Sequence, residues 1–117
     1  MRTEHQTRIL EFMKKAGQET PERPIIPSLA IRQLRANIIL EEALETLEGL
    51  GFAVVSTGEN SSGFAAVPFR EPDIVKAVDG CGDLSVVTMG TLLAFGVKDK
   101  PVLEAVDESN LRKFGPG

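Results

Sequence analysis

The longest uncharged stretch of the chain, LSVVTMGTLLAFGV at residues 84–97, places the strongest limit on its fold. Its 14 residues are fewer than the roughly 20 that a helix needs to cross a bilayer. A run that is apolar nearly all round is typical of a helix buried in a core. The chain has no Trp, no Tyr and six Phe, so its core must be built from aliphatic side chains. We therefore expect helices packed on helices.

Charge and cysteine content narrow the possible partners and compartment. The formal net charge of −4 argues against a nucleic-acid partner but permits a phosphorylated small molecule that a metal ion carries. The single cysteine, Cys81, cannot form an internal disulfide, which fits a reducing compartment. The first residues lack the apolar region of a signal peptide. We expect one soluble cytoplasmic domain, residues 1–117, with no membrane partner.

Periodicity and turn residues divide the chain into elements. The apolar spacing predicts helices over residues 3–16, 29–50, 71–95 and 102–113. Ser28 can cap the second helix, and the sequence KDKP at 98–101 predicts a turn before the last helix. Two short apolar runs within residues 52–69 predict a β-hairpin or an ordered loop inserted between helices. The expected fold is an all-α bundle with this small insertion.

The helix 29–50 carries four glutamates in the segment LEEALETLEGL, residues 40–50. At 100° per residue, Glu41, Glu45 and Glu48 fall within about 60° of one another, with Glu42 beside them. Apolar residues continue this carboxylate face one to three turns earlier: Ile31, Leu34 and Ile38. The face is therefore not plain solvent-exposed surface. The leucines on the opposite side, including Leu40, Leu44 and Leu50, form a wedge typical of a core face.

The helix 71–95 repeats this pattern with Asp79 and Asp83, one turn apart on a stripe that continues with apolar or small residues. Unpaired buried carboxylates are costly, and neighbouring like charges raise one another's pKa. A hard divalent cation such as Mg²⁺ removes both penalties. The spacing equally permits a solvated groove, or ion pairs with Arg32, Arg35 and Lys76.

Three weaker signals have ordinary interpretations. Gly58–Gly63 matches the first six positions of a phosphate-binding P-loop, but Phe64 stands where that motif has lysine, so we expect a hairpin turn. His5 is the only histidine, which leaves a Ser-His or Cys-His hydrolase without support. Gly80 and Gly82 in a helix favour close helix packing, or alternatively leave room for metal-bound water or substrate.

The order of these features resembles the all-α nucleotide pyrophosphohydrolase superfamily, which includes MazG-like proteins and phosphoribosyl-ATP pyrophosphohydrolase. The EExxE signature of that superfamily matches Glu41-Glu42-Ala43-Leu44-Glu45. VDGCGDLSVVTMGTLLAFGV at 78–97 is similar to the run D-A-L-x-D-L-x-Y-V-x-x-G-T-A-x-x-x-G-I of one subfamily. The tail VLEAVDESNLRKFGPG is similar to the V-x-x-S-N-M-x-K ending of the same subfamily. The resemblance covers nearly the whole chain.

The resemblance implies a Mg²⁺-dependent enzyme, with Mn²⁺ as a possible substitute, that cleaves a nucleoside triphosphate into a monophosphate and pyrophosphate. Carried over by position, Glu42, Glu45 and Asp83 are metal ligands, and Glu41 is a ligand or the base for the attacking water. Many members have a glutamate ligand at the position of Gly80. Asp79 lies on the same helix face and can take the place of that glutamate as a metal ligand.

The resemblance also implies that Asn110 and Lys113 contact the nucleotide. Arg112 and Lys98 belong to the same basic cluster in an otherwise acidic chain, which suits the phosphate end of a substrate.

The superfamily completes its bundles across subunits, so we expect a homodimer or homotetramer, in which the 52–69 insertion covers the substrate or forms a dimer contact. Gly80, and Val86 at a position where the subfamily has Tyr, depart from the pattern. They keep open a non-catalytic helical assembly or protein-interaction module as an alternative. Hydrolysis of a non-nucleotide phosphorylated metabolite is a third possibility.

Overall fold

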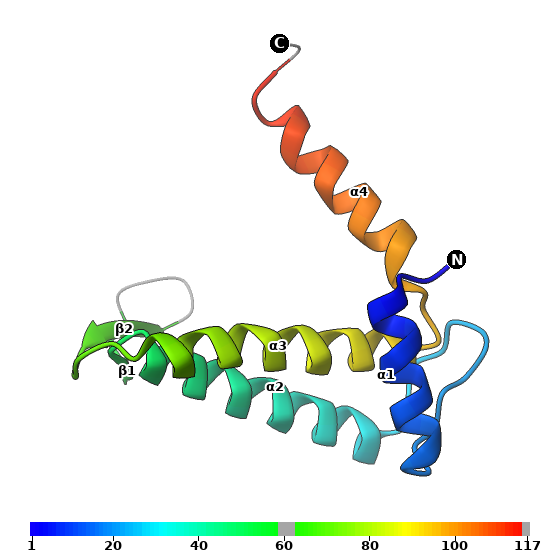
Figure 1. The fold of residues 1–117 in the computed structure, drawn as a ribbon, viewed down its shortest axis with the longest axis horizontal. Coiled ribbons are helices and arrows are strands. Elements are labelled where there is room, and N and C mark those ends of the chain that lie inside the picture. Colours follow the sequence, from blue (N-terminus) through cyan, green and yellow to red (C-terminus); the bar gives the residue numbers. More distant parts are fainter. Residues whose placement is uncertain (59–62, 116–117) are drawn as a thin grey trace. The chain divides into compact units, whose positions relative to one another are not determined.

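The computed structural model describes residues 1–58 and 63–115, which contain four helices and a two-stranded antiparallel sheet (Figure 1). The elements are α1 (Glu4–Lys15), α2 (Leu29–Gly49), β1 (Phe52–Ser56), β2 (Phe64–Pro68), α3 (Ile74–Ala94) and α4 (Asp99–Arg112). The chain forms two compact units, Met1–Ile31 with Thr88–Gly117, and Arg32–Val87. The predicted helical fold with a small hairpin is confirmed.

Most of the predicted boundaries follow from single residues. The backbone of Gly17 has φ +75° just after α1, a conformation that few other residues adopt. The hydroxyl of Ser28 accepts a hydrogen bond from Ile31 N at 3.3 Å, so it caps α2 as expected. α2 ends at Gly49, and Gly51 turns the chain into β1 with φ +95°.

Two helix starts differ from prediction. α4 begins at Asp99, so the turn expected over residues 98–101 is wrong. Lys98 is the N-cap residue, and Pro101 lies in the first turn, where its missing N–H leaves no helical hydrogen bond unmade. α3 begins at Ile74, because the carboxylate of Asp73 accepts a hydrogen bond from Lys76 N at 3.2 Å and caps the helix there.

In the first unit, a buried polar network joins the beginnings of α1 and α4. The fully buried Asp99 accepts hydrogen bonds from Thr3 N, at 2.9 Å, and from the Thr3 hydroxyl. Asp99 N donates to Gln6 Oε1 at 3.0 Å, and Gln6 Nε2 donates to Val97 O at 3.1 Å. A small apolar cluster of Ile9, Met13 and Leu93 forms the core of this unit.

In the second unit, α2 and α3 run antiparallel at close range (Figure 1). A Cβ on Gly49 would lie 2.5 Å from Ala77 N, and a Cβ on Gly80 would lie 2.9 Å from Thr46 Cα. Glycine at both positions therefore permits the approach, which confirms the packing interpretation for Gly80. Gly82 faces open space instead.

The segment after α2 is the predicted hairpin. β1 pairs with β2 in a register that runs from Phe52 opposite Pro68 to Ser56 opposite Phe64. Pro68 lies at the end of an edge strand, where proline is tolerated. Residues 59–62, on which the predicted turn falls, lie outside the described part of the chain.

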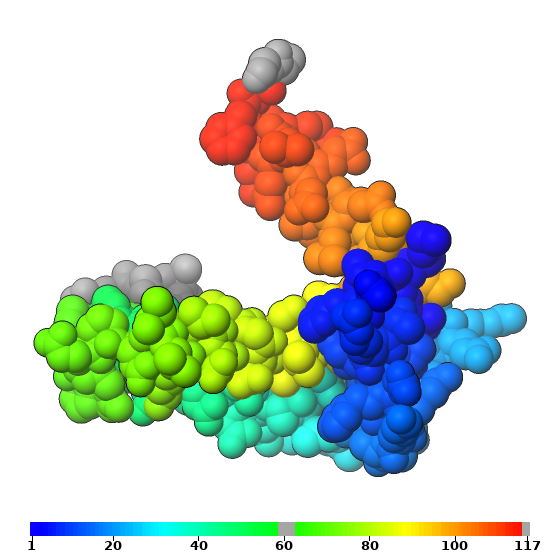
Figure 2. All heavy atoms as spheres, in the orientation of Figure 1, coloured from blue at the N-terminus to red at the C-terminus, as the bar shows by residue number. Residues whose placement is uncertain are grey.

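The predicted core face of α2 is exposed in the single chain. Leu40 is 58% exposed, Leu44 42% and Leu50 49%. The buried residues of α2 are instead Arg35, Thr46 and Gly49, which face α3. Within the single chain, α2 therefore packs on α3 through this glycine-containing face and not through the predicted leucine face. The first turns of α3 are likewise uncovered: Ile74, Val75 and Val78 are exposed, and Figure 2 shows this end of the helix at the surface of the face that it draws. Leu93 and Ala94, near the other end of α3, are buried.

Candidate active site

An acidic groove lies between α2 and α3 within the second unit. Its charged lining comes from α2, from α3 and from the residue that caps α3, and consists of four acids and one lysine: Glu45, Asp73, Lys76, Asp79 and Asp83. Asp79 and Asp83 both line it because they are one turn apart on α3, and Glu45 lines it from α2. Three of the five acids that the sequence analysis selected therefore line one hollow.

Glu42 lies at the centre of the buried face of α2. The buried residues of this helix are Arg35, seven residues before Glu42, and Thr46 and Gly49, four and seven residues after it. The Arg35 guanidinium donates to Val87 O at 2.8 Å, and the Thr46 hydroxyl donates to Glu42 O at 2.7 Å. Glu42 Oε2 is buried, and no hydrogen-bond donor reaches it within the described residues. A buried carboxylate oxygen without a donor is costly, and a cation would remove the cost.

The surroundings of Glu42 raise its pKa. Burial is the largest cause, followed by the negative charges of Glu45, Asp83 and Glu41 and by a hydrogen bond with Asp83. The remaining two selected acids, Glu41 and Glu42, are thus electrostatically coupled to the groove.

The donors fit a hard divalent ion in kind and in charge. Carboxylate oxygens are the preferred protein ligands of Mg²⁺, and Mn²⁺ accepts the same donors. Within residues 1–58 and 63–115, however, no three His, Cys, Asp or Glu side chains converge as a ready-made metal site. The structure therefore supplies the ligand type in one groove, while the assignment of Glu42, Glu45, Asp79 and Asp83 as metal ligands stays a prediction.

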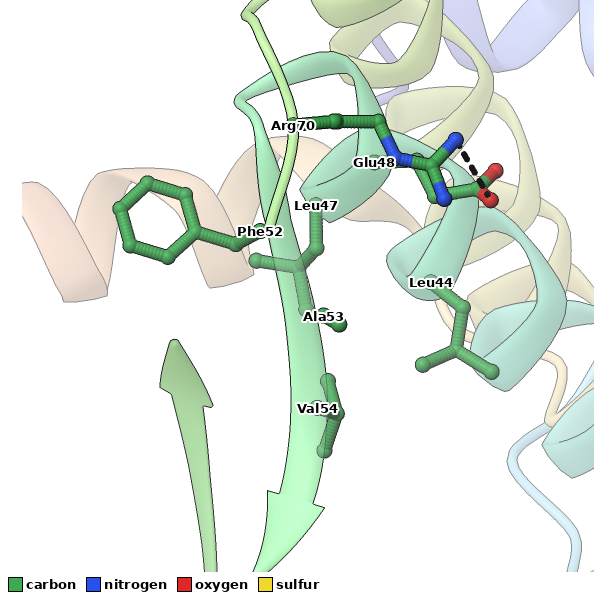
Figure 3. Close-up of a pocket in the computed structure, with 7 residues that line it drawn as sticks. All are labelled: Leu44, Leu47, Glu48, Phe52, Ala53, Val54 and Arg70. Atoms are coloured by element: carbon green, nitrogen blue, oxygen red, sulfur yellow. Dashed lines mark ion pairs between the residues drawn. The ribbon is translucent and has the colours of Figure 1, made fainter. Parts of the chain in front are cut away.

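Glu48 differs from the other glutamates of α2, because basic side chains hold both of its oxygens. Lys76 Nζ lies 2.9 Å from Oε2, and Arg70 Nη1 lies 3.5 Å from Oε1, as Figure 3 shows for the arginine. The hydrogen bond and charge of Lys76, and then the charge of Arg70, lower the pKa of Glu48. Glu48 is therefore an ion-pair partner, neither a free ligand nor a merely solvated residue.

A second hollow, mainly apolar, lies between α2 and β1 (Figure 3). Side chains of α2 and β1 line it, with Glu48 and Arg70 at its edge: Leu44, Leu47, Phe52, Ala53 and Val54. Arg70 also lies over the ring of Phe69, 5.1 Å from its centroid. Glu48 contributes to this hollow and is paired with Lys76 of the acidic groove.

The basic residues selected from the sequence belong to the first unit. Within it, Arg112 Nη1 pairs with Glu108 Oε1 at 3.1 Å, and Lys113 Nζ donates to Asn110 Oδ1 at 3.1 Å. The contacts predicted between a nucleotide and Lys98, Asn110, Arg112 and Lys113 stay predictions. Sequence reasoning considered Lys76 only as an ion-pair candidate. Its spacing of three and seven residues from Asp79 and Asp83 could have placed it in the groove.

Comparison with known families identifies the chain. The family model described as phosphoribosyl-ATP pyrophosphohydrolase matches residues 9–110, which include α2, the hairpin, α3 and every acid discussed above. This match places the chain among the MazG-like all-α pyrophosphohydrolases, hydrolases that act on phosphoric anhydride bonds. Within that class, the chain belongs to the phosphoribosyl-ATP pyrophosphohydrolase family. No curated protein matches it.

Proposed function

We propose that this chain is a Mg²⁺-dependent nucleotide pyrophosphohydrolase that cleaves nucleoside triphosphates between the α and β phosphates, releasing a monophosphate and pyrophosphate. Family membership supports the reaction type, on phosphoribosyl-ATP or on nucleotides. The observation that supports the metal requirement is the buried Oε2 of Glu42, which no donor among the described residues reaches and which lies near the charges of Glu45 and Asp83. A divalent cation stabilises such a cluster and would bring a polyphosphate to it.

Each acid has a role in this proposal. Glu42, Glu45, Asp79 and Asp83 would hold the ion, which when bound polarises phosphoryl oxygens and acidifies water. Glu41 is exposed and contributes its charge to the same cluster. An exposed carboxylate there can accept a proton from the attacking water as a general base. Lys98, Asn110, Arg112 and Lys113 are proposed to contact the nucleotide.

The proposed enzyme is a homodimer or homotetramer. The apolar side chains that the single chain leaves exposed on α2 and α3 support this assembly, because large contiguous apolar surfaces mark interaction sites. The same surfaces also suit a non-catalytic assembly module, which would bind copies of itself without turnover.

The decisive experiment is pyrophosphate release from a panel of ribo- and deoxynucleoside triphosphates and phosphoribosyl-ATP, with Mg²⁺ or Mn²⁺. The wild-type chain is compared with a Glu42→Gln, Asp83→Asn double variant and with Glu104→Gln, which removes an exposed acid of α4. We expect release that needs metal, vanishes in the double variant and persists in Glu104→Gln. A folded wild-type protein that binds metal and releases nothing from any substrate would support the assembly module.

A further inference from the structure

The acidic groove has an unusual charge balance for a site that receives a polyphosphate. Among the described residues that line it, four are acidic and one, Lys76, is basic. A nucleoside triphosphate adds several negative charges, which one divalent ion offsets only in part. A cation that touches the phosphates directly is therefore expected in the groove itself.

Lys76 occupies the right part of α3 for this task. It precedes Asp83 by seven residues, so the two side chains leave the helix on nearly the same face, about 10 Å apart along its axis. Asp79 lies between them, one turn from each. A polyphosphate bound to an ion at the aspartates would extend along the groove toward the lysine, whose long flexible side chain shortens the remaining distance.

The partner of Lys76 in the free protein is easily exchanged. Its ammonium lies 2.9 Å from Glu48 Oε2, and the two side chains are 43% and 38% exposed. Ion pairs with this exposure contribute little to stability. Arg70 lies 3.5 Å from the other oxygen of Glu48, so the glutamate keeps a cationic partner when Lys76 turns away.

We propose that Lys76 is a phosphate-binding residue that exchanges Glu48 for the leaving pyrophosphate. This inference rests on the proposed function. In the reaction, the oxygen of water bonds to the α-phosphorus and the bond from that phosphorus to the bridging oxygen breaks. The bridging oxygen keeps the electron pair and leaves on pyrophosphate, and the proton of water passes to Glu41. Lys76 stabilises the charge that develops on the leaving group.

The test compares Lys76→Met with Arg70→Met, which removes the other cation next to Glu48 but not a residue that lines the groove. Steady-state kinetics, inhibition by pyrophosphate and by the monophosphate product, and the Mn²⁺-induced shift in Tm are measured for each. For Lys76→Met we expect kcat/KM to fall, and the pyrophosphate inhibition constant to rise, by about tenfold to a hundredfold. In Lys76→Met, inhibition by the monophosphate and the Mn²⁺-induced shift in Tm stay as in the wild type. In Arg70→Met, kcat/KM and both inhibition constants stay within about twofold of the wild-type values.

A third variant, Glu48→Gln, separates phosphate binding from a purely structural ion pair. If Lys76 only pairs with Glu48, the two variants Glu48→Gln and Lys76→Met must behave alike. We expect the opposite, because the released ammonium and the lost negative charge keep or strengthen pyrophosphate binding in Glu48→Gln. Equal defects in both variants, or wild-type kinetics and inhibition in Lys76→Met, would overturn the proposal.

Failure of the proposed function gives a different pattern. In that case the wild-type protein releases no pyrophosphate from any substrate. Calorimetric titration with magnesium pyrophosphate then tests Lys76 directly. Binding that Lys76→Met weakens supports the phosphate contact, whereas equal or absent binding in both proteins overturns it.

Discussion

At the scale of single residues, Glu42 shows most clearly how the proposed function can oppose stability, because its buried carboxylate lies near other negative charges. Its raised pKa means that the folded state holds a proton more tightly than the unfolded state. The contribution of Glu42 to the free energy of unfolding is therefore fully present below its ordinary pKa of 4.5. This contribution is lost as the pH rises through the raised pKa of the folded state. Groups arranged for binding commonly reduce stability in this way.

We therefore expect Glu42→Gln to raise the Tm of the metal-free protein at neutral pH and to change it little near pH 4. Removing the charge removes the repulsion from Glu45, Asp83 and Glu41. In Mn²⁺ the order reverses, because only the wild type gains stability from the ion. Thermal unfolding from about pH 4 to pH 8, in chelator and in Mn²⁺, measures both effects.

Glu48 provides the control of opposite sign. Because the pKa of Glu48 is lowered, its contribution to the free energy of unfolding is present above pH 4.5 and is lost as the pH falls through the lowered pKa. Glu48→Gln should lower Tm slightly at neutral pH and leave the Mn²⁺ response intact. If Glu42→Gln also lowers Tm in chelator at neutral pH, the carboxylate is not strained, and the argument for a missing cation fails.

At the scale of helices, the two glycines of α3 near the acids have different environments. Gly80→Ala should destabilise the chain by about 1 to 3 kcal/mol, because its Cβ would meet Thr46 of α2. Gly82→Ala meets nothing within 4 Å and should stabilise the helix by up to roughly 1 kcal/mol. Urea unfolding of both variants measures the difference. Equal effects would mean that α2 and α3 do not approach through Gly80.

The network at the start of α4 predicts another pair of effects. Asp99→Ala leaves Thr3 N and the Thr3 hydroxyl without their buried acceptor, at a cost of about 1 to 3 kcal/mol. Asp107→Ala removes an exposed acid of the same helix and should change stability by less than about 0.5 kcal/mol. Thermal unfolding compares them, and a neutral Asp99→Ala would show that α1 and α4 do not depend on this contact.

The sequence predicted the elements better than it predicted their contacts. Local signals such as Gly17 and Ser28 set helix ends, because caps and positive φ depend on neighbouring residues. The contact between Gly80 and Thr46 and the pair of Lys76 with Glu48 join residues that are distant in sequence, so no periodicity reveals them. The acids were found because helical spacing repeats within one element. Whether they converge on an ion depends on side-chain positions that spacing does not determine.

At the scale of the whole molecule, the exposed apolar surface indicates an interaction with a partner that would bury it. Of the described apolar residues, only Ile9, Met13, Leu93 and Ala94 are buried. By length and composition alone, α3 is also long and apolar enough to cross a membrane, as the core helix of a soluble protein can be. Asp79 and Asp83 lie within it, and each acid at the centre of a membrane helix costs about 2.5 to 3.5 kcal/mol on insertion scales. This cost favours the proposed second copy of the chain over a membrane as the partner of this surface.

Val78, 64% exposed on α3, tests this argument. We expect the wild type to elute as a dimer or tetramer by size exclusion with light scattering, with a Tm that rises with protein concentration. Val78→Asp places a charge within the apolar surface and should shift the mass toward the monomer and remove the concentration dependence. Glu104→Gln should leave both unchanged. A wild-type chain that is monomeric at every concentration would exclude the oligomer, and one that needs detergent to stay in solution would favour a membrane as the cover.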